Sequence, residues 1–592
     1  MKSKSFIVAL FTISTLGLMT SCADMFDIDS TRVVYEKDHN LDSTSDSVYT
    51  TLGVLQGMRQ LADRYVILGE VRGDMCDINE NTKTSLRNLA NFNFDASNEY
   101  LDVKDYYAVI NNCNYALAKL DTTITINNRR EMVDEYAALL GIRAWTYLQL
   151  AINYGEIPYY TDPVTTMADL EAVAGMKMTI EEIAPDIVAQ LVPYMDYILP
   201  AFGTSIPQNV YPILRLVAAD FCLWSGDYES AVKYYEEYLM KNKSFTASWG
   251  KGDDTGYENG LLSLGGSYSI WDGDEKKPGR IPFAEEYGDF AKSVYGYENL
   301  AFIPMEASSA NGLTSELFEL FYSLDNTHYL YPSTSWKELS DKQILFDAEK
   351  STTTNKYSVK ASALAGGDMR KDLYYSMRSY EGENFDRYSK FSSSRIVYYR
   401  RAITYLRYAE ALNALAKQKH DVAVVTADSA GLADSRQLAR NAFYLLKDAY
   451  QVFFPVGSER REKYQRFEDE LRDLFIGVHA RGTGHVGRDV EHYVLTPTAI
   501  AARIPTDSVT FNDTILFIDE LIIDELALES TLEGNRFGDL IRFAKRRKEW
   551  GDSEYRDFLA NRVANRGVED ERNDSLYNKL NNSEDFWYLP LK

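Results

Sequence analysis

The chain has 592 residues, of which 45% are hydrophobic and 26% charged, with a formal net charge of −25 at pH 7. This excess of negative charge repels nucleic acids and anionic lipid surfaces, so it argues against nucleic-acid binding. The four cysteines show no CxxC spacing, so the sequence indicates neither a disulfide framework nor a zinc site.

Residues 1–21 have the pattern of a bacterial lipoprotein signal peptide. The apolar run over residues 6–18 follows two lysines and is too short to span a bilayer core of roughly 30 Å as a helix. Ser21 and Cys22 then resemble a lipobox, in which lipid is attached to the cysteine. We expect cleavage before Cys22, lipidation of that residue and anchoring in the outer membrane facing the exterior, with residues 22–45 as a tether. The alternative is an ordinary signal followed by an incidental cysteine.

Helical periodicity dominates the chain up to residue 240. Apolar residues recur at steps of three and four in residues 48–65, 103–120, 130–153, 180–198 and 213–240. The sequence therefore predicts a mainly α fold, with an amino-terminal helical region over residues 46–240.

One pair of helices has the spacing of a tetratricopeptide repeat. Its marker residues are Gly226, Tyr228, Ala231 and Tyr235. In that repeat the glycine permits a sharp turn and the alanine permits two helices to approach closely. Because one pair cannot bury its own apolar face, we expect the helices near residues 399–417 and 435–453 to stack on it as a helical-repeat scaffold.

Residues 241–396 differ in composition, being rich in Gly, Ser, Asp and aromatic residues. This composition predicts a loop-rich, partly β insertion. Recognition residues often lie on such excursions from a rigid frame. Residues 397–592 return to helical periodicity and form the predicted carboxy-terminal region.

Several blocks resemble, in order, motifs of the SusD/RagB family of outer-membrane nutrient-binding lipoproteins. They are GEVRGD at residues 69–74, the set Tyr107, Ile110 and Asn114, EYAALLGIRAWTYLQLAINYGEIPYY at 135–160, Asp368-Met369-Arg370, Lys390-Phe391, YLRYAEALNALA from Tyr405, ESTLEGNRFGDLIRFA at 529–544, and Trp587-Tyr588-Leu589-Pro590. The resemblance spans nearly the whole chain after the signal.

The resemblance implies a SusD-like fold and a role in nutrient uptake. Members of the family bind glycan on a loop-rich face and cover a SusC-like TonB-dependent transporter. For this chain it implies an oligosaccharide-binding lipoprotein that delivers glycan to such a transporter, without enzymatic activity or a cofactor. A peptide-binding RagB-type lipoprotein is the alternative, and a surface glycan hydrolase ranks behind both.

The resemblance places the ligand surface in two segments. The candidates are Asn81, Arg87, Asn91, Phe92 and Tyr100 after the R-G-D block, and Trp271, Tyr329, Tyr331 and Trp336 in the insertion. Aromatic rings can stack on the C–H faces of sugars, while amides and arginine meet the hydroxyls. Trp271 and Trp336 rank first among them.

Other motifs are interpreted as structural. The R-G-D tripeptide is expected to form a structural turn, and the G-x-G-x-x-G match at residues 482–487 lacks the flanking strand and helix of a dinucleotide site. The resemblance gives structural ion pairs as the expected role of Arg143, Glu533, Arg536 and Asp539.

Neither a metal site nor a catalytic site is predicted. His479, His485 and His492 have no known ligand spacing and are expected in surface loops. A glycoside hydrolase needs two carboxyl groups about 5 to 10 Å apart, and no motif singles out such a pair.

Overall fold

The computed structural model describes most of the chain. The described residues are 41, 44–202, 206–241, 264, 299–305, 314–321, 329–343, 346–350, 357–361, 368, 370–371, 375–380, 383–388, 395–468, 471–472, 475–483, 493–567 and 572–591. The predicted signal peptide over residues 1–21, Cys22, Trp271, Met369, Lys390, Phe391, His485 and His492 lie outside them.

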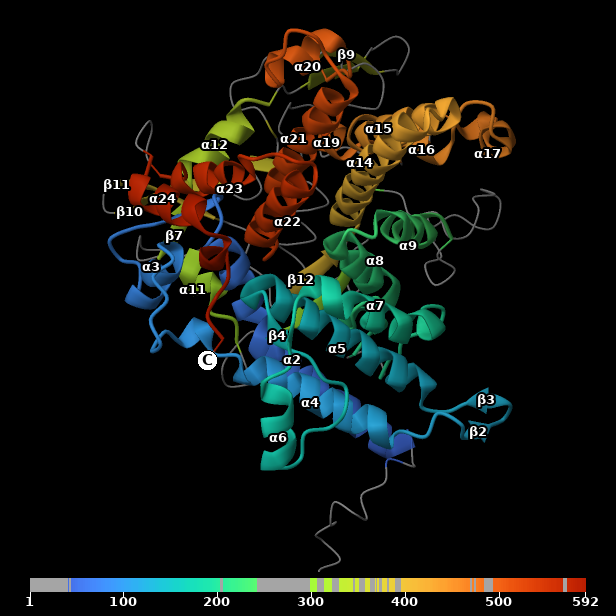
Figure 1. The fold of residues 1–592 in the computed structure, drawn as a ribbon, viewed down its shortest axis with the longest axis vertical. Helices are drawn as coiled ribbons and strands as arrows, with labels where there is room; N and C mark the ends of the chain where they lie inside the picture. Colours follow the sequence, from blue (N-terminus) through green and yellow to red (C-terminus); the bar gives the residue numbers. More distant parts are fainter. Residues whose placement is uncertain are drawn as a thin grey trace, which may run out of the picture.

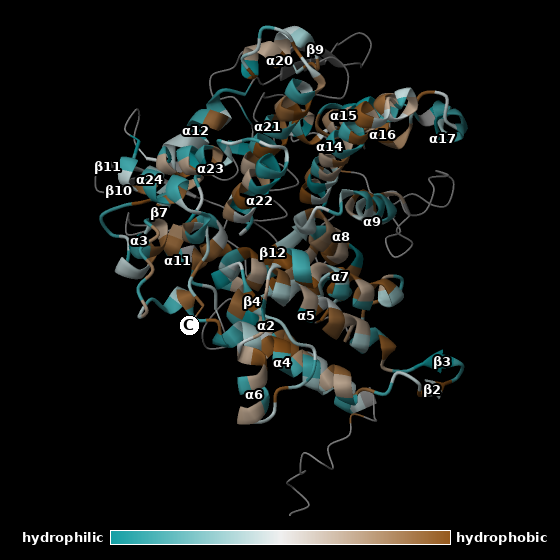
Figure 2. Cartoon of the chain, viewed as in Figure 1, coloured by the Kyte–Doolittle hydropathy of each residue, from teal (hydrophilic) through white to brown (hydrophobic). Residues whose placement is uncertain are grey.

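The amino-terminal helices pack around α5 (Val133–Tyr154), which is buried on nearly every side. Its apolar sequence is consistent with a helix that is covered all round. It contacts α2 (Thr44–Glu70) and α4 (Lys104–Lys119), and Figure 2 shows hydrophobic residues along α4 and α5. Peripheral elements such as α17 (Glu459–Lys463) are hydrophilic.

A series of helix pairs forms the repeat scaffold (Figure 1). The helices α7 (Ile180–Leu191), α8 (Leu214–Ser225) and α9 (Tyr228–Lys241) pack in order, and α9 then packs on α14 (Arg401–Thr426), which pairs with α15 (Ser429–Lys447). This arrangement confirms the predicted mainly α, tetratricopeptide-like fold.

The turn between α8 and α9 explains the repeat spacing. Gly226 has φ +81°, a left-handed conformation that favours glycine. Ala231 is fully buried, and the Tyr235 hydroxyl donates to an Asp220 oxygen at 2.5 Å, which ties the two helices together.

The carboxy-terminal helices complete the molecule, and one of them packs on the first described helix. They are α21 (Phe511–Glu529), α22 (Arg536–Glu549), α23 (Tyr555–Ala564) and α24 (Asp574–Asn582). Helix α22 contacts α2, and the Gly534 amide donates to Glu70 Oε1 at 2.8 Å. The R-G-D block and the E-G-N-R block, which lie far apart in the sequence, therefore meet in one place.

Short strands join the helices. Each sheet among the described residues is a two-stranded antiparallel pair: β1 (Cys76–Ile78) with β7 (Leu330–Pro332), β2 (Thr125–Ile126) with β3 (Arg129–Arg130), β4 (Ile157–Pro158) with β5 (Lys177–Met178), β6 (Asn299–Pro304) with β12 (Arg395–Arg400), β8 (Phe346–Lys350) with β9 (Tyr357–Ala361), and β10 (Tyr375–Tyr380) with β11 (Glu383–Tyr388). Four of these six pairs use strands from the predicted insertion.

The smaller helical elements connect these parts. They are α3 (Thr84–Ala90), η2 (Glu99–Leu101), α6 (Met167–Ala174), η3 (Val192–Tyr194), η4 (Gln208–Val210), α11 (Leu317–Phe321), α12 (Thr334–Asp341), α16 (Tyr450–Phe453), η5 (Gln465–Phe467), α19 (Val478–Gly482), α20 (Pro497–Arg503) and η6 (Glu584–Trp587).

The R-G-D tripeptide is structural, as predicted. Arg72 is fully buried and donates to the carbonyls of Leu68 at 2.9 Å and Trp587 at 3.2 Å. Asp74 is buried beside Arg536, whose Nε donates to Asp74 Oδ1 at 2.6 Å. Neither charged side chain is presented to solvent, which leaves no surface ligand motif here.

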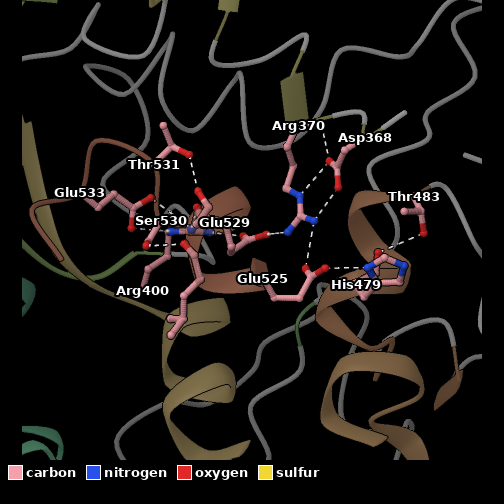
Figure 3. A network of polar contacts seen from close by, with 12 residues as sticks. Asp368, Arg370, Arg400, His479, Thr483, Glu525, Glu529, Ser530, Thr531 and Glu533 are labelled. Carbon is pink, nitrogen blue, oxygen red and sulfur yellow. Dashed lines mark hydrogen bonds and ion pairs between the residues drawn. The ribbon is translucent and has the colours of Figure 1, made fainter. Parts of the chain in front are cut away.

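A buried ionic network joins α21 to the insertion (Figure 3). Arg370 contacts Asp368 at 2.6 Å, Glu525 at 3.0 Å and Glu529 at 2.8 Å, and Arg400 contacts Glu529 at 2.6 Å. The arginines hold the pKa of the Glu529 carboxyl well below its usual range despite burial.

This network corrects the prediction for His479. The side chain is buried, with Nδ1 2.6 Å from Glu525 Oε1 and its ring stacked on Tyr493. It lies here and not in a surface loop because α19 packs against α21. The glycine-rich segment after Thr483 lies outside the described residues.

The predicted structural ion pairs are confirmed for three residues of the four. Glu533 pairs with Arg400 at 3.1 Å, Arg536 with Asp74, and Asp539 with Arg542 at 2.8 Å. Arg143 has a different set of partners, since its guanidinium donates to the side-chain amide oxygens of Asn114 and Gln190.

Candidate ligand-binding site

The pairing of β1 with β7 brings the two predicted ligand segments together. Ile78 lies opposite Leu330, and the Thr82 hydroxyl donates to the Tyr329 carbonyl at 2.5 Å. The Ser333 hydroxyl donates to the Asp74 carbonyl at 2.6 Å and closes the other end. Residues separated by about 250 positions thus share one surface, which we call the β1/β7 surface.

Four of the candidates lie on or beside this surface. Asn81 and Arg87 are exposed, and Tyr329 and Tyr331 are half-buried. Arg87 donates to the carbonyls of Asn79 and Glu80, both at 3.2 Å, so it also shapes the loop. These side chains supply aromatic faces, an amide and a guanidinium to one part of the molecule.

Lys83 adds a cation next to the aromatic group. Its ammonium nitrogen lies 5.1 Å from the ring centroid of Tyr329 and 4.0 Å from Glu316 Oε2. A cation at this distance from a tyrosine ring is attracted to the ring face. Lys83 therefore restricts the position of Tyr329 while remaining exposed itself.

A cavity of about 310 Å³ adjoins the β1/β7 surface. Its lining comes from α2, η2 and the insertion: Arg59, Gln60, Asp63, Arg64, Lys83, Glu99, Tyr100, Met305, Thr314 and Glu316. The ring of Tyr100 is largely buried, but its hydroxyl donates to Glu316 Oε1 at 3.4 Å. Tyr100 is therefore part of the wall of the cavity.

The lining of the cavity combines carboxyl groups with cationic side chains. Asp63 accepts hydrogen bonds from the Ser315 hydroxyl at 2.6 Å and the Glu316 amide at 2.7 Å, yet burial raises the pKa of its carboxyl. Burial, followed by the neighbouring charge of Asp63, also raises the pKa of Glu316. Such carboxyl groups can exchange hydrogen bonds with hydroxyl groups.

Trp336 was predicted to bind ligand, and its burial in the structure shows that this prediction was wrong. It is fully buried, and its indole N–H donates to the Thr531 hydroxyl at 2.8 Å. The Ser333 hydroxyl caps α12 by accepting a hydrogen bond from the Trp336 amide. Trp336 therefore lies in the first turn of α12, and this helix packs on α21. The ring belongs to the core and offers no face to a ligand.

Phe92 is also removed from the β1/β7 surface by burial, and the backbone of Asn91 beside it contacts the carboxy-terminal part of the chain. Phe92 is 2% exposed and packs between Phe94 and Phe537. The Asn91 carbonyl accepts a hydrogen bond from Lys579 at 3.3 Å. Both residues join the loop to the carboxy-terminal part of the chain.

Asp63, Lys83 and Glu316 were not among the residues predicted for the site from the sequence. Asp63 is one of three acidic residues in α2 and belongs to no motif, and Glu316 comes from a loop whose position depends on tertiary contacts. Lys83 directly precedes the first residue of α3, so its place next to the candidate segment was the only available signal.

The part of the chain that the structure describes was also searched for metal sites and for membrane-spanning helices. Within them, no group of three His, Cys, Asp or Glu side chains is arranged to hold a metal ion. None of the helices that the structure describes is both long and apolar enough to cross a membrane.

Comparisons with known proteins support the fold assignment. No protein-family model and no curated protein matches the chain. Among solved structures, surface glycan-binding protein A from Bacteroides uniformis is similar with a TM-score of 0.53 and 15% identity, covering 93% of this chain and 96% of that one. A SusD superfamily protein from Bacteroides vulgatus has a TM-score of 0.51 and 12% identity, with coverage of 93% and 96%. The chain therefore has a SusD-like fold.

Proposed function

We propose that this SusD-like chain binds oligosaccharide at the cell surface and delivers it to a SusC-like TonB-dependent transporter, without acting on it chemically. The observation that carries the proposal is the β1/β7 surface, where Tyr329, Tyr331, Asn81 and Arg87 gather beside a cavity lined by charged side chains. The fold similarity to a surface glycan-binding protein over 93% of the chain supports it.

The chemistry of the surface suits sugar rings. A ring can lay its C–H face on Tyr329 or Tyr331, while its hydroxyls exchange hydrogen bonds with Asn81, Arg87 and Glu316. The cavity lining combines three carboxyl groups, from Asp63, Glu99 and Glu316, with three cationic groups, from Arg59, Arg64 and Lys83, so it offers both acceptors and donors to sugar hydroxyls.

One of the three carboxyl groups in the cavity has a structural role. Glycoside hydrolysis needs one carboxyl group to donate a proton and a second to act as nucleophile or base. Both oxygens of Asp63 already accept hydrogen bonds from the insertion. Asp63 is thereby committed to holding the loop at Ser315 and Glu316, which supports a role in shaping the cavity.

The proposed location at the outer membrane is inferred from the sequence. A lipid attached at Cys22 would hold the protein at the outer membrane, where the acidic chain faces the medium. Delivery to a transporter follows from the family resemblance and from this position at the surface. Isolation of the protein from membranes with its intact lipid, followed by co-purification of a TonB-dependent barrel, tests both parts.

Calorimetric titration against neutral oligosaccharides and against peptides tests the binding proposal. We expect saturable binding of at least one neutral oligosaccharide, with the sugar recovered at its original length. Binding of peptides alone would favour the peptide-binding alternative. Steady release of shorter sugars would show a hydrolase and contradict the proposal.

A further inference from the structure

A larger groove lies where the carboxy-terminal segment crosses the end of α5. Its volume is about 740 Å³, within the range of roughly 300 to 1,000 Å³ typical of small-molecule sites. The Leu589 amide donates to the Asn153 carbonyl at 2.9 Å and holds the segment against α5. The groove and the cavity beside the β1/β7 surface have no lining residue in common.

Aromatic side chains line this groove. Phe586 is 41% exposed, and Phe94 and Tyr588 are half-buried. Gly155, with φ +74°, lies directly under the Tyr588 ring, and a Cβ there would be 3.0 Å from the ring. The absence of a side chain at Gly155 thus allows the ring of Tyr588 to lie against the backbone as a fixed wall.

Carboxylates form the polar part of the groove. Glu181 pairs with Lys545, and Glu584 pairs with Lys548 at the other side. Glu156 and Asp585 are exposed and take part in no ion pair among the described residues. Lys177 is the single basic residue in the lining, so the groove is acidic overall.

Aromatic faces combined with free carboxylates favour one class of ligand. The rings can stack on the C–H faces of sugars, and the carboxylates of Glu156 and Asp585 can accept hydrogen bonds from hydroxyls. A sulfated or uronic sugar would bring its negative charge next to several carboxylates, which is unfavourable. A purely apolar ligand would leave these charged groups without compensation.

We propose that this groove is a second carbohydrate site, separate from the β1/β7 surface, which binds neutral sugar rings by stacking on Phe586 and Tyr588 and excludes anionic sugars. The inference rests on the proposed function, because it assumes that the protein is a glycan binder. It adds a site and a charge selectivity that the β1/β7 surface does not itself require.

The test uses short ligands, so that one molecule does not fill both sites. Wild-type protein, Phe586→Ala and the matched control Tyr197→Ala are titrated with neutral di- and trisaccharides of glucose, galactose, mannose and xylose, and with sulfated and uronic trisaccharides. Tyr197 is 37% exposed, similar to Phe586, but does not line the groove. Thermal unfolding of each variant checks that the fold is retained.

We expect Phe586→Ala to weaken binding of a neutral sugar roughly 3- to 10-fold, as for loss of one stacking ring, while Tyr197→Ala has no effect. Asp585→Lys is expected to relax the exclusion of anionic sugars. Unchanged binding in Phe586→Ala, with wild type still binding sugar and losing affinity in Tyr329→Ala, would overturn the second site alone. Absence of sugar binding by the wild type would overturn both proposals.

Discussion

At the scale of single residues, the buried pair of Asp74 and Arg536 gives the clearest prediction. Both side chains are almost fully buried, so removal of one charge leaves the other without its partner. We expect Asp74→Ala to lower the free energy of unfolding by about 3 to 5 kcal/mol. In the exposed pair of Lys342 with Glu338, Lys342→Ala should change it by less than about 1 kcal/mol. Urea unfolding compares the two, and equal losses would contradict the structural role of the R-G-D block.

The lowered pKa of Glu520 predicts that the free energy of unfolding depends on pH. Arg562, Arg547 and Arg503 together lower the pKa of its carboxyl to about 2, against the opposing effect of burial. Because the folded pKa lies below the unfolded one, the stabilisation is complete above about pH 5 and is lost as pH falls toward 2. The stability difference between wild type and Glu520→Gln should be about 1 kcal/mol smaller at pH 3.5 than at pH 7. A difference that stays constant in urea unfolding across this range would contradict the prediction.

The candidate residues show how far sequence reasoning reaches at this scale. Asn81, Arg87, Tyr329 and Tyr331 could be predicted because the two segments that contain them are identifiable from the sequence. Burial could not be predicted for Trp336, since a tryptophan suits a ligand surface and a core equally well by type. Its burial follows from the contact of α12 with α21, which local sequence does not encode.

At the scale of secondary-structure elements, the α8/α9 turn can be tested with two glycines. Gly226 has φ +81°, and a Cβ there would meet only Glu549 Oε1 at 4.0 Å, an ordinary contact, so a side chain there strains chiefly the backbone. We expect Gly226→Ala to lower the free energy of unfolding by about 1 to 2 kcal/mol. Gly53 lies inside α2 with nothing near its Cβ position, so Gly53→Ala should raise it by up to about 1 kcal/mol. Urea unfolding that gives both changes the same sign would refute this account of the turn.

Helices were predicted better than the contacts between strands. The apolar periodicity over residues 130–153 and 213–240 matches α5 and the pair α8 and α9 closely, because amphipathic helices are encoded locally. The pairing of β1 with β7 was not predicted. Each strand has three residues, and they are brought together by the hydroxyls of Thr82 and Ser333 acting across the chain.

At the scale of the whole molecule, the net charge of −25 bears on the nature of the ligand. Interactions between charges weaken as salt shortens the screening length from about 10 Å at 0.1 M to 3 Å at 1 M. A neutral glycan should therefore bind with less than about a twofold change in Kd between 0.1 and 1 M sodium chloride. Calorimetric titration at the two concentrations tests this, and a basic peptide ligand would instead lose affinity strongly.

The helical frame and the SusD-like fold were predictable for the whole molecule, because the residues of blocks such as 135–160 and 529–544 pack within the helical scaffold. The cavity beside the β1/β7 surface was not predictable, since Asp63 and Glu316 come from a helix and a loop some 250 residues apart. The groove at Phe586 was also missed, because its walls come from α5, the loop at Phe94 and the end of the chain.

Binding of a neutral oligosaccharide to wild type and to Tyr329→Ala is the most direct test of the central claim. Loss of the Tyr329 ring should weaken the affinity roughly 3- to 10-fold in calorimetric titration, with no product formed by either protein. Tyr49→Ala, which removes a 74% exposed tyrosine from the start of α2, serves as the control and should bind as wild type does. Equal affinities for wild type and Tyr329→Ala, or no saturable binding of any glycan, would contradict the proposed site.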